Sequence, residues 1–237
     1  MHYFFTGLSL INTKGLRRYV LIPLSINLVL FAIAFFYLMT QVGAWVDGIL
    51  AFIPQWLDFL EYLLWPFLVI TVVLSMAFTF TMVANFIAAP FNALLSEKVE
   101  LHLTGQALPE QGFSAFMADV PRMLKREWTK FIYCVPRALV FLLVFFLLPV
   151  IGQVVWFLFT SWMMAIQYCD YPYDNHKITF DKMREQLRGD LTGSYSFGIT
   201  VSIASMVPFL NLLVMPVAVC GATAMWVDRY KQSHYPR

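Results

Sequence analysis

Four long stretches of this sequence contain no Asp, Glu, Lys or Arg, and they constrain the fold more than any other feature. They cover residues 19–39, 62–96, 138–169 and 191–227, which are 21, 35, 32 and 37 residues long. About 20 apolar residues cross the hydrocarbon core of a bilayer, so each stretch is long enough to enter a membrane. Only 13% of the 237 residues are charged, against about 25% in a soluble domain. The sequence therefore predicts an all-α integral membrane protein, with one membrane domain over residues 1–237.

The first two stretches are each expected to form a long transmembrane helix. Residues 19–39 have the length of a single span. Residues 62–96 would extend roughly 50 Å as one helix, so this helix should tilt, bend near Pro90 or project beyond the bilayer. Between them, residues 41–61 carry two Trp residues and apolar residues at helical spacing. That pattern predicts a periplasmic amphipathic segment lying at the membrane surface.

The last two stretches are each broken near the middle, at Pro149–Gly152 and at Pro208–Asn211. Each break leaves halves of about 16 Å of helix, roughly half the thickness of the hydrocarbon core. We therefore expect residues 138–169 and 191–227 to form two re-entrant, half-spanning helical hairpins. In the alternative, each hairpin is a pair of full spans. Non-helical backbone at membrane depth must be buried in protein or line a water-filled cavity, so the breaks indicate either a transport pathway or packing within a multimer.

The placement of the Lys and Arg residues predicts the membrane topology. All 16 lie before residue 19, in residues 97–137, in residues 170–190 or after residue 227, and none lies in residues 40–61. Cytoplasmic loops carry the excess of basic residues. Residues 40–61 should therefore lie outside, whereas residues 97–137, the loop 170–190 and both termini should lie in the cytoplasm.

Residues 97–137 are a basic amphipathic region in which an apolar stripe alternates with Arg122, Lys125, Arg126 and Lys130. One interpretation is a helix that lies on anionic lipid. The other is an electropositive vestibule that concentrates anions, with Arg122 and Arg126 at its mouth.

A pathway through the membrane domain would be lined by backbone dipoles and neutral polar side chains, for which the candidates are Asn27, Asn85, Asn92 and Gln167. Proton relays through membranes usually use ionisable groups, and the four stretches contain no Asp, Glu, Lys or Arg. We therefore expect a channel-like or gated path. Proton coupling stays open as an alternative, through acidic groups at the rim such as Glu97.

The sequence contains none of the motifs of zinc proteases, P-loop proteins, serine hydrolases or dinucleotide-binding enzymes, so we expect neither an enzyme nor a cofactor. Cys134, Cys169 and Cys220 lack the spacing of a metal or redox site and are interpreted as packing residues. His176 lies among acidic residues with interleaved Lys residues, a pattern interpreted as a solvated loop. Topology explains the basic residues, so no nucleic-acid partner is expected.

The segment Thr13–Arg18 lies directly before the first expected span and suits an oxyanion. Free N–H groups and the dipole at a helix start favour negative charge, and Gly15 lets a ligand approach the backbone. Arg17 or Arg18 can add forked, charge-assisted hydrogen bonds. The alternative is ordinary basic flanking of a membrane helix.

Six short motifs together resemble the CysZ family of bacterial inner-membrane sulfate permeases. Their order and spacing match almost from end to end, and they are Gly15–Arg18, Trp65–Pro66, Ala88–Asn92, Asp119–Trp128, Gln167–Pro172 and Met215–Trp226. The resemblance implies sulfate uptake across the bacterial inner membrane for cysteine biosynthesis, by a homo-oligomer that is a dimer or larger. It also implies two long transmembrane helices with two pairs of half-penetrating helices.

The resemblance further implies that sulfate is held at Gly15, Leu16, Arg17 and Arg18, where the sequence shows no departure from the family pattern. Two other functions stay open beside a sulfate channel. One is a scaffold or accessory subunit that moves nothing itself, and the other is a proton-coupled sulfate symporter.

Overall fold

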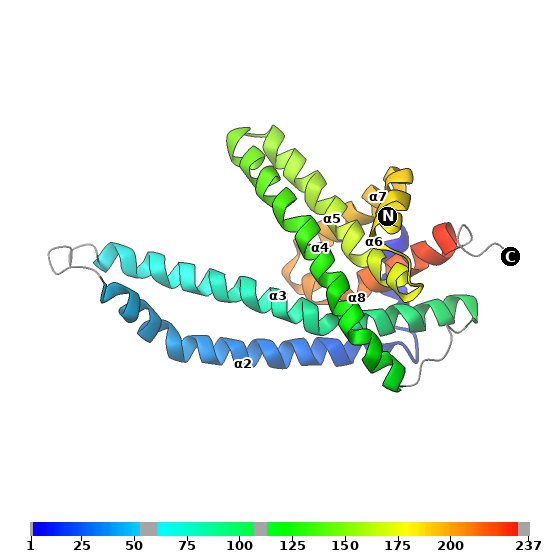
Figure 1. Ribbon diagram of the computed structural model, residues 1–237, viewed down its shortest axis with the longest axis horizontal. Helices are drawn as coiled ribbons and strands as arrows, with labels where there is room; N and C mark the ends of the chain where they lie inside the picture. Colours follow the sequence, from blue (N-terminus) through cyan, green and yellow to red (C-terminus); the bar gives the residue numbers. More distant parts are fainter. Residues whose placement is uncertain (1, 53–60, 107–112, 232–237) are drawn as a thin grey trace. The chain divides into compact units, whose positions relative to one another are not determined.

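The computed structural model describes residues 2–52, 61–106 and 113–231, which are almost entirely helical and contain no β-strand (Figure 1). Among these described residues, two helices are long and apolar enough to cross a membrane, over residues Arg17–Leu50 and Met117–Leu147. The predicted all-α membrane protein is therefore confirmed. The helices in chain order are α1 (His2–Leu10), α2 (Arg17–Leu50), α3 (Glu61–Thr104), α4 (Phe113–Leu147), α5 (Ile151–Asn175), α6 (Phe180–Gly189), α7 (Leu191–Ser205), α8 (Pro208–Met225) and a π-helix (Trp226–Tyr230).

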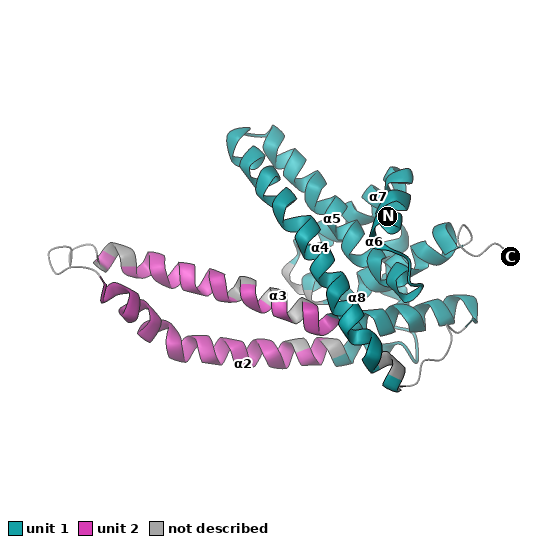
Figure 2. Ribbon diagram, in the orientation of Figure 1, with its two compact units in different colours: residues 1–22, 89–237 teal, residues 23–88 magenta. Residues whose placement is uncertain are grey.

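The chain divides into two units (Figure 2). Unit 2, residues 23–88, contains most of α2 and the first part of α3, and the rings of Phe31 and Phe80 lie 5.6 Å apart in it. Large apolar side chains such as Phe36 and Phe67 are 69% and 64% exposed. A soluble unit rarely exposes a continuous apolar surface of this kind, whereas a lipid-facing helix pair does.

Both helices of unit 2 run past the boundaries expected from the sequence. α2 continues to Leu50 as one helix of 34 residues, so Trp45 belongs to it rather than to a separate surface helix. Residues 53–60 of that predicted segment lie outside the described residues. α3 has 44 residues and extends about 66 Å, longer than a bilayer core, and its residues from Ala89 onward belong to unit 1.

The predicted break in residues 138–169 is confirmed, but the helix before it is longer than expected. α4 runs unbroken for 35 residues through Pro121 and Pro136, so no boundary separates the basic region from the apolar half beginning at residue 138. The chain turns at Leu148–Val150, where Val150 has a φ of 70°. Gly152 follows, and a Cβ atom there would lie 2.5 Å from the carbonyl oxygen of Val144. The turn therefore requires a residue without a side chain.

The second break lies at Met206–Val207, directly before the first residue of α8, so Pro208–Asn211, where the sequence places the break, is already helical. Pro at the first helical position has no N–H to leave unpaired and has a φ suited to a helix. The two arms of this hairpin, α7 and α8, have 15 and 18 residues.

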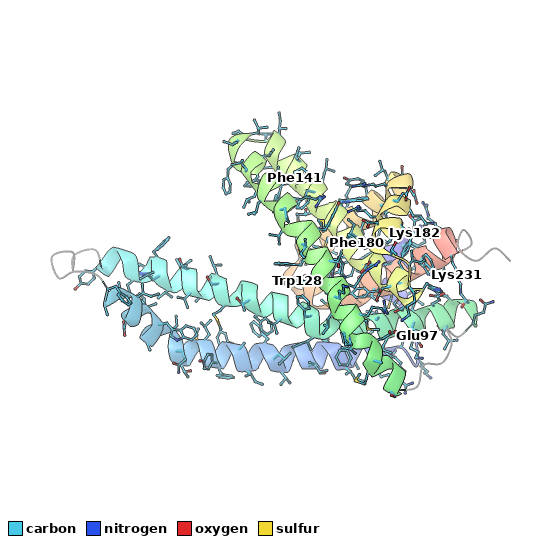
Figure 3. All side chains as sticks on the ribbon, viewed as in Figure 1. Glu97, Trp128, Phe141, Phe180, Lys182 and Lys231 are labelled. Atoms are coloured by element: carbon cyan, nitrogen blue, oxygen red, sulfur yellow. The ribbon has the colours of Figure 1, made fainter. Side chains whose placement is uncertain are left out.

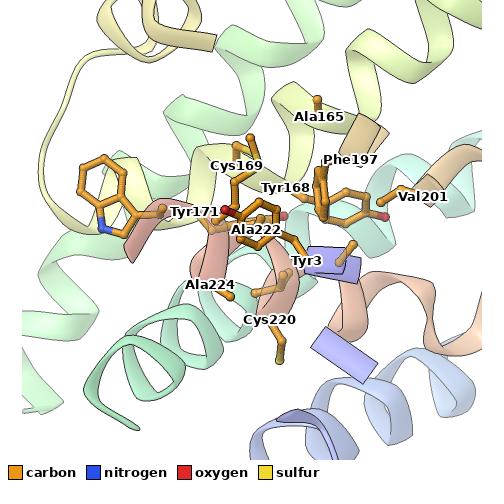
Figure 4. Packing of buried hydrophobic residues seen from close by; sticks show 14 of the residues in the cluster. Tyr3, Ala165, Tyr168, Cys169, Tyr171, Phe197, Val201, Cys220, Ala222 and Ala224 are labelled. Carbon is orange, nitrogen blue, oxygen red and sulfur yellow. The ribbon is translucent and has the colours of Figure 1, made fainter. Parts of the chain in front are cut away.

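The core of unit 1, residues 1–22 and 89–237, forms where α5, α7, α8 and α1 pack together (Figure 4). Its buried side chains include Tyr173, Phe197 and Trp226. Helices α5 and α7 approach so closely that a Cβ atom at Gly198 would overlap the carbonyl oxygen of Ser161. Small residues allow membrane helices to bring their backbones together, and this contact joins the two broken hairpins.

The expected loop 170–190 is mostly helical instead. α5 continues to Asn175, and α6 begins at Phe180 after an N-cap at Thr179. α6 buries Met183 and Leu187 on one face, and its charged residues lie on the other. The sequence did not predict this helix because five of its ten residues are charged and its apolar stripe is short.

We predict that Gly198→Ala destabilises the protein by about 1–3 kcal/mol, because the added methyl group must separate α5 from α7. Thermal unfolding of the purified protein in detergent would show a lower midpoint. Gly48→Ala is the matched control, since a Cβ atom there meets nothing within 4 Å. Equal midpoints for the two variants would contradict the close contact.

Candidate functional site

The segment that joins α1 to α2 carries the predicted oxyanion site. The N–H groups of Ile11, Asn12 and Thr13 donate to carbonyls in the last turns of α1, which continues the chain into a tight turn. Gly15 then has a φ of 98°, a conformation that residues with a side chain rarely adopt. Leu16 is only 4% exposed and anchors the segment in the core.

The backbone at this position offers free donors. The N–H of Leu16 donates to the carbonyl of Thr13 over 3.1 Å, and that of Tyr19 donates to Leu16 over 3.0 Å. Within the described ranges, the N–H groups of Gly15, Arg17 and Arg18 have no hydrogen-bond acceptor. These groups lie at the start of α2, where the helix dipole favours an anion.

Both guanidinium groups are exposed and oriented by neighbouring groups of the same segment. The Nε of Arg17 donates to the carbonyl of Asn12 over 2.9 Å. The Nη2 of Arg18 donates to the hydroxyl of Tyr19 over 3.2 Å, and its guanidinium lies 4.9 Å from the centre of that ring. Neither side chain pairs with a carboxylate among the residues that the structure describes. The four predicted residues, Gly15 to Arg18, thus combine free N–H donors with unneutralised positive charge.

Two of the four candidate pathway residues meet at a tyrosine that the sequence did not single out. The side-chain amides of Asn92 and Gln167 donate to the hydroxyl of Tyr171, over 3.2 and 3.4 Å. Asn92 is 2% exposed, so this neutral polar cluster is buried in unit 1. Asn27 and Asn85 fall within α2 and α3, but their side chains lie outside the described part of the structure.

Arg122 and Arg126 do not form an open positive mouth, because both are paired with carboxylates of α5. The Nε and Nη2 of Arg126 donate to Asp170 over 2.8 and 2.6 Å. Arg122 pairs with Asp174. The charges of these two residues are therefore balanced within unit 1.

Lys130 completes the ion-pair cluster. Its ammonium lies 2.6 Å from the carboxylate of Glu127 and 3.4 Å from that of Asp170. It also lies 4.7 Å from the centre of the Tyr171 ring, which connects the ion pairs to the neutral polar cluster. Lys130 and Asp170 are 3% and 1% exposed, so the charges are buried and mutually neutralised.

The sequence pattern after Cys169 indicates a solvated loop, but the structure contradicts this interpretation. Asp170 and Asp174 lie in α5 and are buried. Asp170 and Asp174 are one helical turn apart on α5, and Arg122, Arg126 and Lys130 follow the same spacing on α4. Residues four apart lie on one face of a helix, so the two faces match in charge. This complementary spacing is a signal in the sequence that could have revealed the pairing.

His176 belongs to a second ionic group, at the end of α3. Its Nε2 lies 2.9 Å from the carboxylate of Glu100. The ammonium of Lys231, which is labelled in Figure 3, lies 2.9 Å from the same carboxylate. Burial of Glu100 opposes ionisation, but the hydrogen bonds from His176 and Lys231 hold its pKa below the ordinary value. At Asp174 the effect of burial outweighs the opposing charge of Arg122, so the pKa of this carboxyl is raised.

Glu97, the candidate rim acid, forms an ion pair with Lys98 over 2.8 Å. No group of three or more His, Cys, Asp or Glu side chains in the described ranges could hold a metal ion. Cys169 and Cys220 are free and buried in the core, and Cys134 is free and partly buried.

Comparison with known proteins gives the family. The family described as "Sulfate transporter CysZ/Etoposide-induced protein 2.4" matches residues 3–216. The chain is also 52% identical over 235 residues to the sulfate transporter CysZ of Pectobacterium atrosepticum, and the match covers 98% of this chain and 85% of that relative. The resemblance found in the sequence is confirmed: the chain belongs to the sulfate transporter CysZ/etoposide-induced protein 2.4 family.

Proposed function

We propose that this chain carries sulfate across the inner membrane of a bacterium and so supplies sulfate assimilation and cysteine biosynthesis. The observation that carries the proposal is the start of α2, where free N–H groups and two unneutralised guanidinium groups lie together. The name of the Pectobacterium relative supports sulfate as the anion.

In this proposal Gly15, Leu16, Arg17 and Arg18 hold the sulfate. The N–H groups of Gly15, Arg17 and Arg18 donate to its oxygens, and the guanidinium groups supply positive charge and forked hydrogen bonds. Arg17 keeps its Nη groups for this purpose, because its contact to Asn12 uses Nε. Leu16 makes no polar side-chain contact and holds the segment in the core.

The sulfate then moves by a channel-like or gated path. The buried cluster of Asn92, Gln167 and Tyr171 is neutral, and neutral donors can bind an anion weakly enough to release it. Moving a doubly charged anion into a cell with a negative-inside membrane potential costs about 2.3 kcal/mol per charge per 100 mV. Net uptake by such a path is therefore driven by consumption of sulfate inside the cell. This chemistry requires neither a cofactor nor a catalytic group.

The membrane arrangement is part of the proposal. Both termini lie in the cytoplasm, residues 40–61 lie in the periplasm, and the α4–α5 and α7–α8 hairpins are re-entrant. At the first hairpin turn Phe146, Val150 and Ile151 are 72%, 71% and 63% exposed. An exposed apolar tip of this kind is stable against lipid or against another copy of the chain, which fits a homo-oligomer in the bilayer.

We predict that the double variant Arg17→Ala/Arg18→Ala binds sulfate at least about tenfold more weakly, because each charge-assisted hydrogen bond contributes about 1.5–3 kcal/mol. Isothermal titration calorimetry of the purified full-length protein with sodium sulfate measures the change. Arg188→Ala is the control, since it removes an exposed arginine at the end of α6. Unchanged affinity in the double variant would leave Arg17 and Arg18 with only a topological role.

We further predict that proteoliposomes containing only this protein take up labelled sulfate without a pH gradient. An inside-negative potential should slow that uptake, because the anion carries two charges. Uptake that occurs only with an inward proton gradient would instead identify a symporter. Liposomes that stay empty under both conditions would identify a scaffold or accessory subunit.

A further inference from the structure

The N-terminal helix α1, which the sequence did not predict, packs against α8 with direct backbone contact. A Cβ atom at Gly7 would overlap the carbonyl oxygen of Val217 and lie 2.8 Å from the N of Gly221. In the opposite direction, a Cβ atom at Gly221 would lie 2.5 Å from the carbonyl oxygen of Tyr3. Glycine on each helix therefore sets the distance between them, and a side chain at either position would separate them. Tyr3 lies near Ala222 in the core (Figure 4).

The first turn of α1 is also clamped by polar groups. The hydroxyl of Tyr3 donates to the carboxylate of Asp228 and accepts from the Nε of Arg229 over 3.0 Å. Arg229 in turn donates to Asp190, the N-cap of α7, over 2.6 Å. Tyr3 is only 5% exposed, whereas Asp228 and Arg229 are exposed, so the loss of its hydroxyl would remove two partly buried hydrogen bonds.

The last turns of α1 continue directly into the oxyanion segment. The N–H groups of Ile11 and Thr13 donate to the carbonyls of Gly7 and Leu10, over 3.1 and 3.0 Å. The carbonyl of Asn12 then holds the Nε of Arg17. On either side of Gly15, residues Leu10, Ile11, Leu16 and Val20 are buried in the core. The position of the free N–H groups therefore depends on where α1 ends.

We propose that α1 is the positioning element of the oxyanion site, and that its packing against α8 determines whether Gly15, Arg17 and Arg18 converge on one anion. Gly7 and Tyr3 are positioning residues that act through the segment after α1 and do not touch the anion. The proposal rests on the proposed function of that site. Because α8 is an arm of the second broken hairpin, anion binding and the packing of α1 on that hairpin are linked, and each favours the other.

The main test is Gly7→Ala, assayed by calorimetry with sodium sulfate on the purified full-length protein. We expect about tenfold weaker binding, because the site is populated only while α1 is packed against α8. Hydrogen exchange of residues 11–18 should become faster at the same time. Gly198→Ala is the matched control, because it introduces the same kind of helix clash between α5 and α7 but should leave sulfate affinity unchanged.

Tyr3→Phe gives a second, milder test that keeps the packing of the ring. We expect roughly two- to fivefold weaker sulfate binding and faster exchange in residues 11–18. Tyr133→Phe is its control, since it removes a hydroxyl that accepts from Trp162 in another part of the core.

Two results would overturn the proposal. They are unchanged affinity in both α1 variants and an equal loss of affinity in the control variants. If the wild-type protein binds no sulfate, the proposed function fails. The exchange of residues 11–18 then still decides whether α1 orders the segment.

Discussion

Backbone hydrogen bonding without water is the constraint on which this structure depends. An unpaired N–H or C=O group in hydrocarbon costs several kcal/mol, so a chain in lipid satisfies its backbone within helices. Helices α2 and α3 do so over 34 and 44 residues. N–H groups without an acceptor are stable only where water or an anion can reach them. In the described part of the chain, Gly15, Arg17 and Arg18 provide such groups directly before a long apolar helix.

Burial divides the basic residues into two groups with different consequences. Arg126 and Lys130 are buried with Asp170, and their charges cancel inside the protein. Such pairs fix how α4 packs on α5 but project little potential outward. Arg17 and Arg18 are exposed and lack a carboxylate partner among the described residues, so their charge remains available to a ligand. The positive potential therefore comes from fewer residues than the total of Lys and Arg suggests.

Local chemistry in the sequence was sufficient to predict that both hairpins are broken near the middle. Pro149–Gly152 and Pro208 mark breaks that the structure contains, because Pro and Gly act within a few residues. Long-range pairing was not predictable in the same way. The charges of α4 and α5 can be paired with one another only once the two helices are known to pack together. Tyr171 accepts a hydrogen bond from Asn92, which is 79 residues away in the sequence. α1 was missed because a helix of nine residues is stabilised by packing on α8 rather than by its own sequence.

The contact between Tyr3 and Asp228 spans 225 positions of the chain and has a consequence for assembly. Ribosomes deliver the N-terminal end first, so α1 and the segment after it exist long before the residues that clamp them. Contacts of such high sequence separation form late, after the intervening helices have packed. The Thr13–Arg18 segment is therefore expected to become ordered only when the last helix is in place. A chain released before that helix is made would enter the bilayer with this segment unclamped.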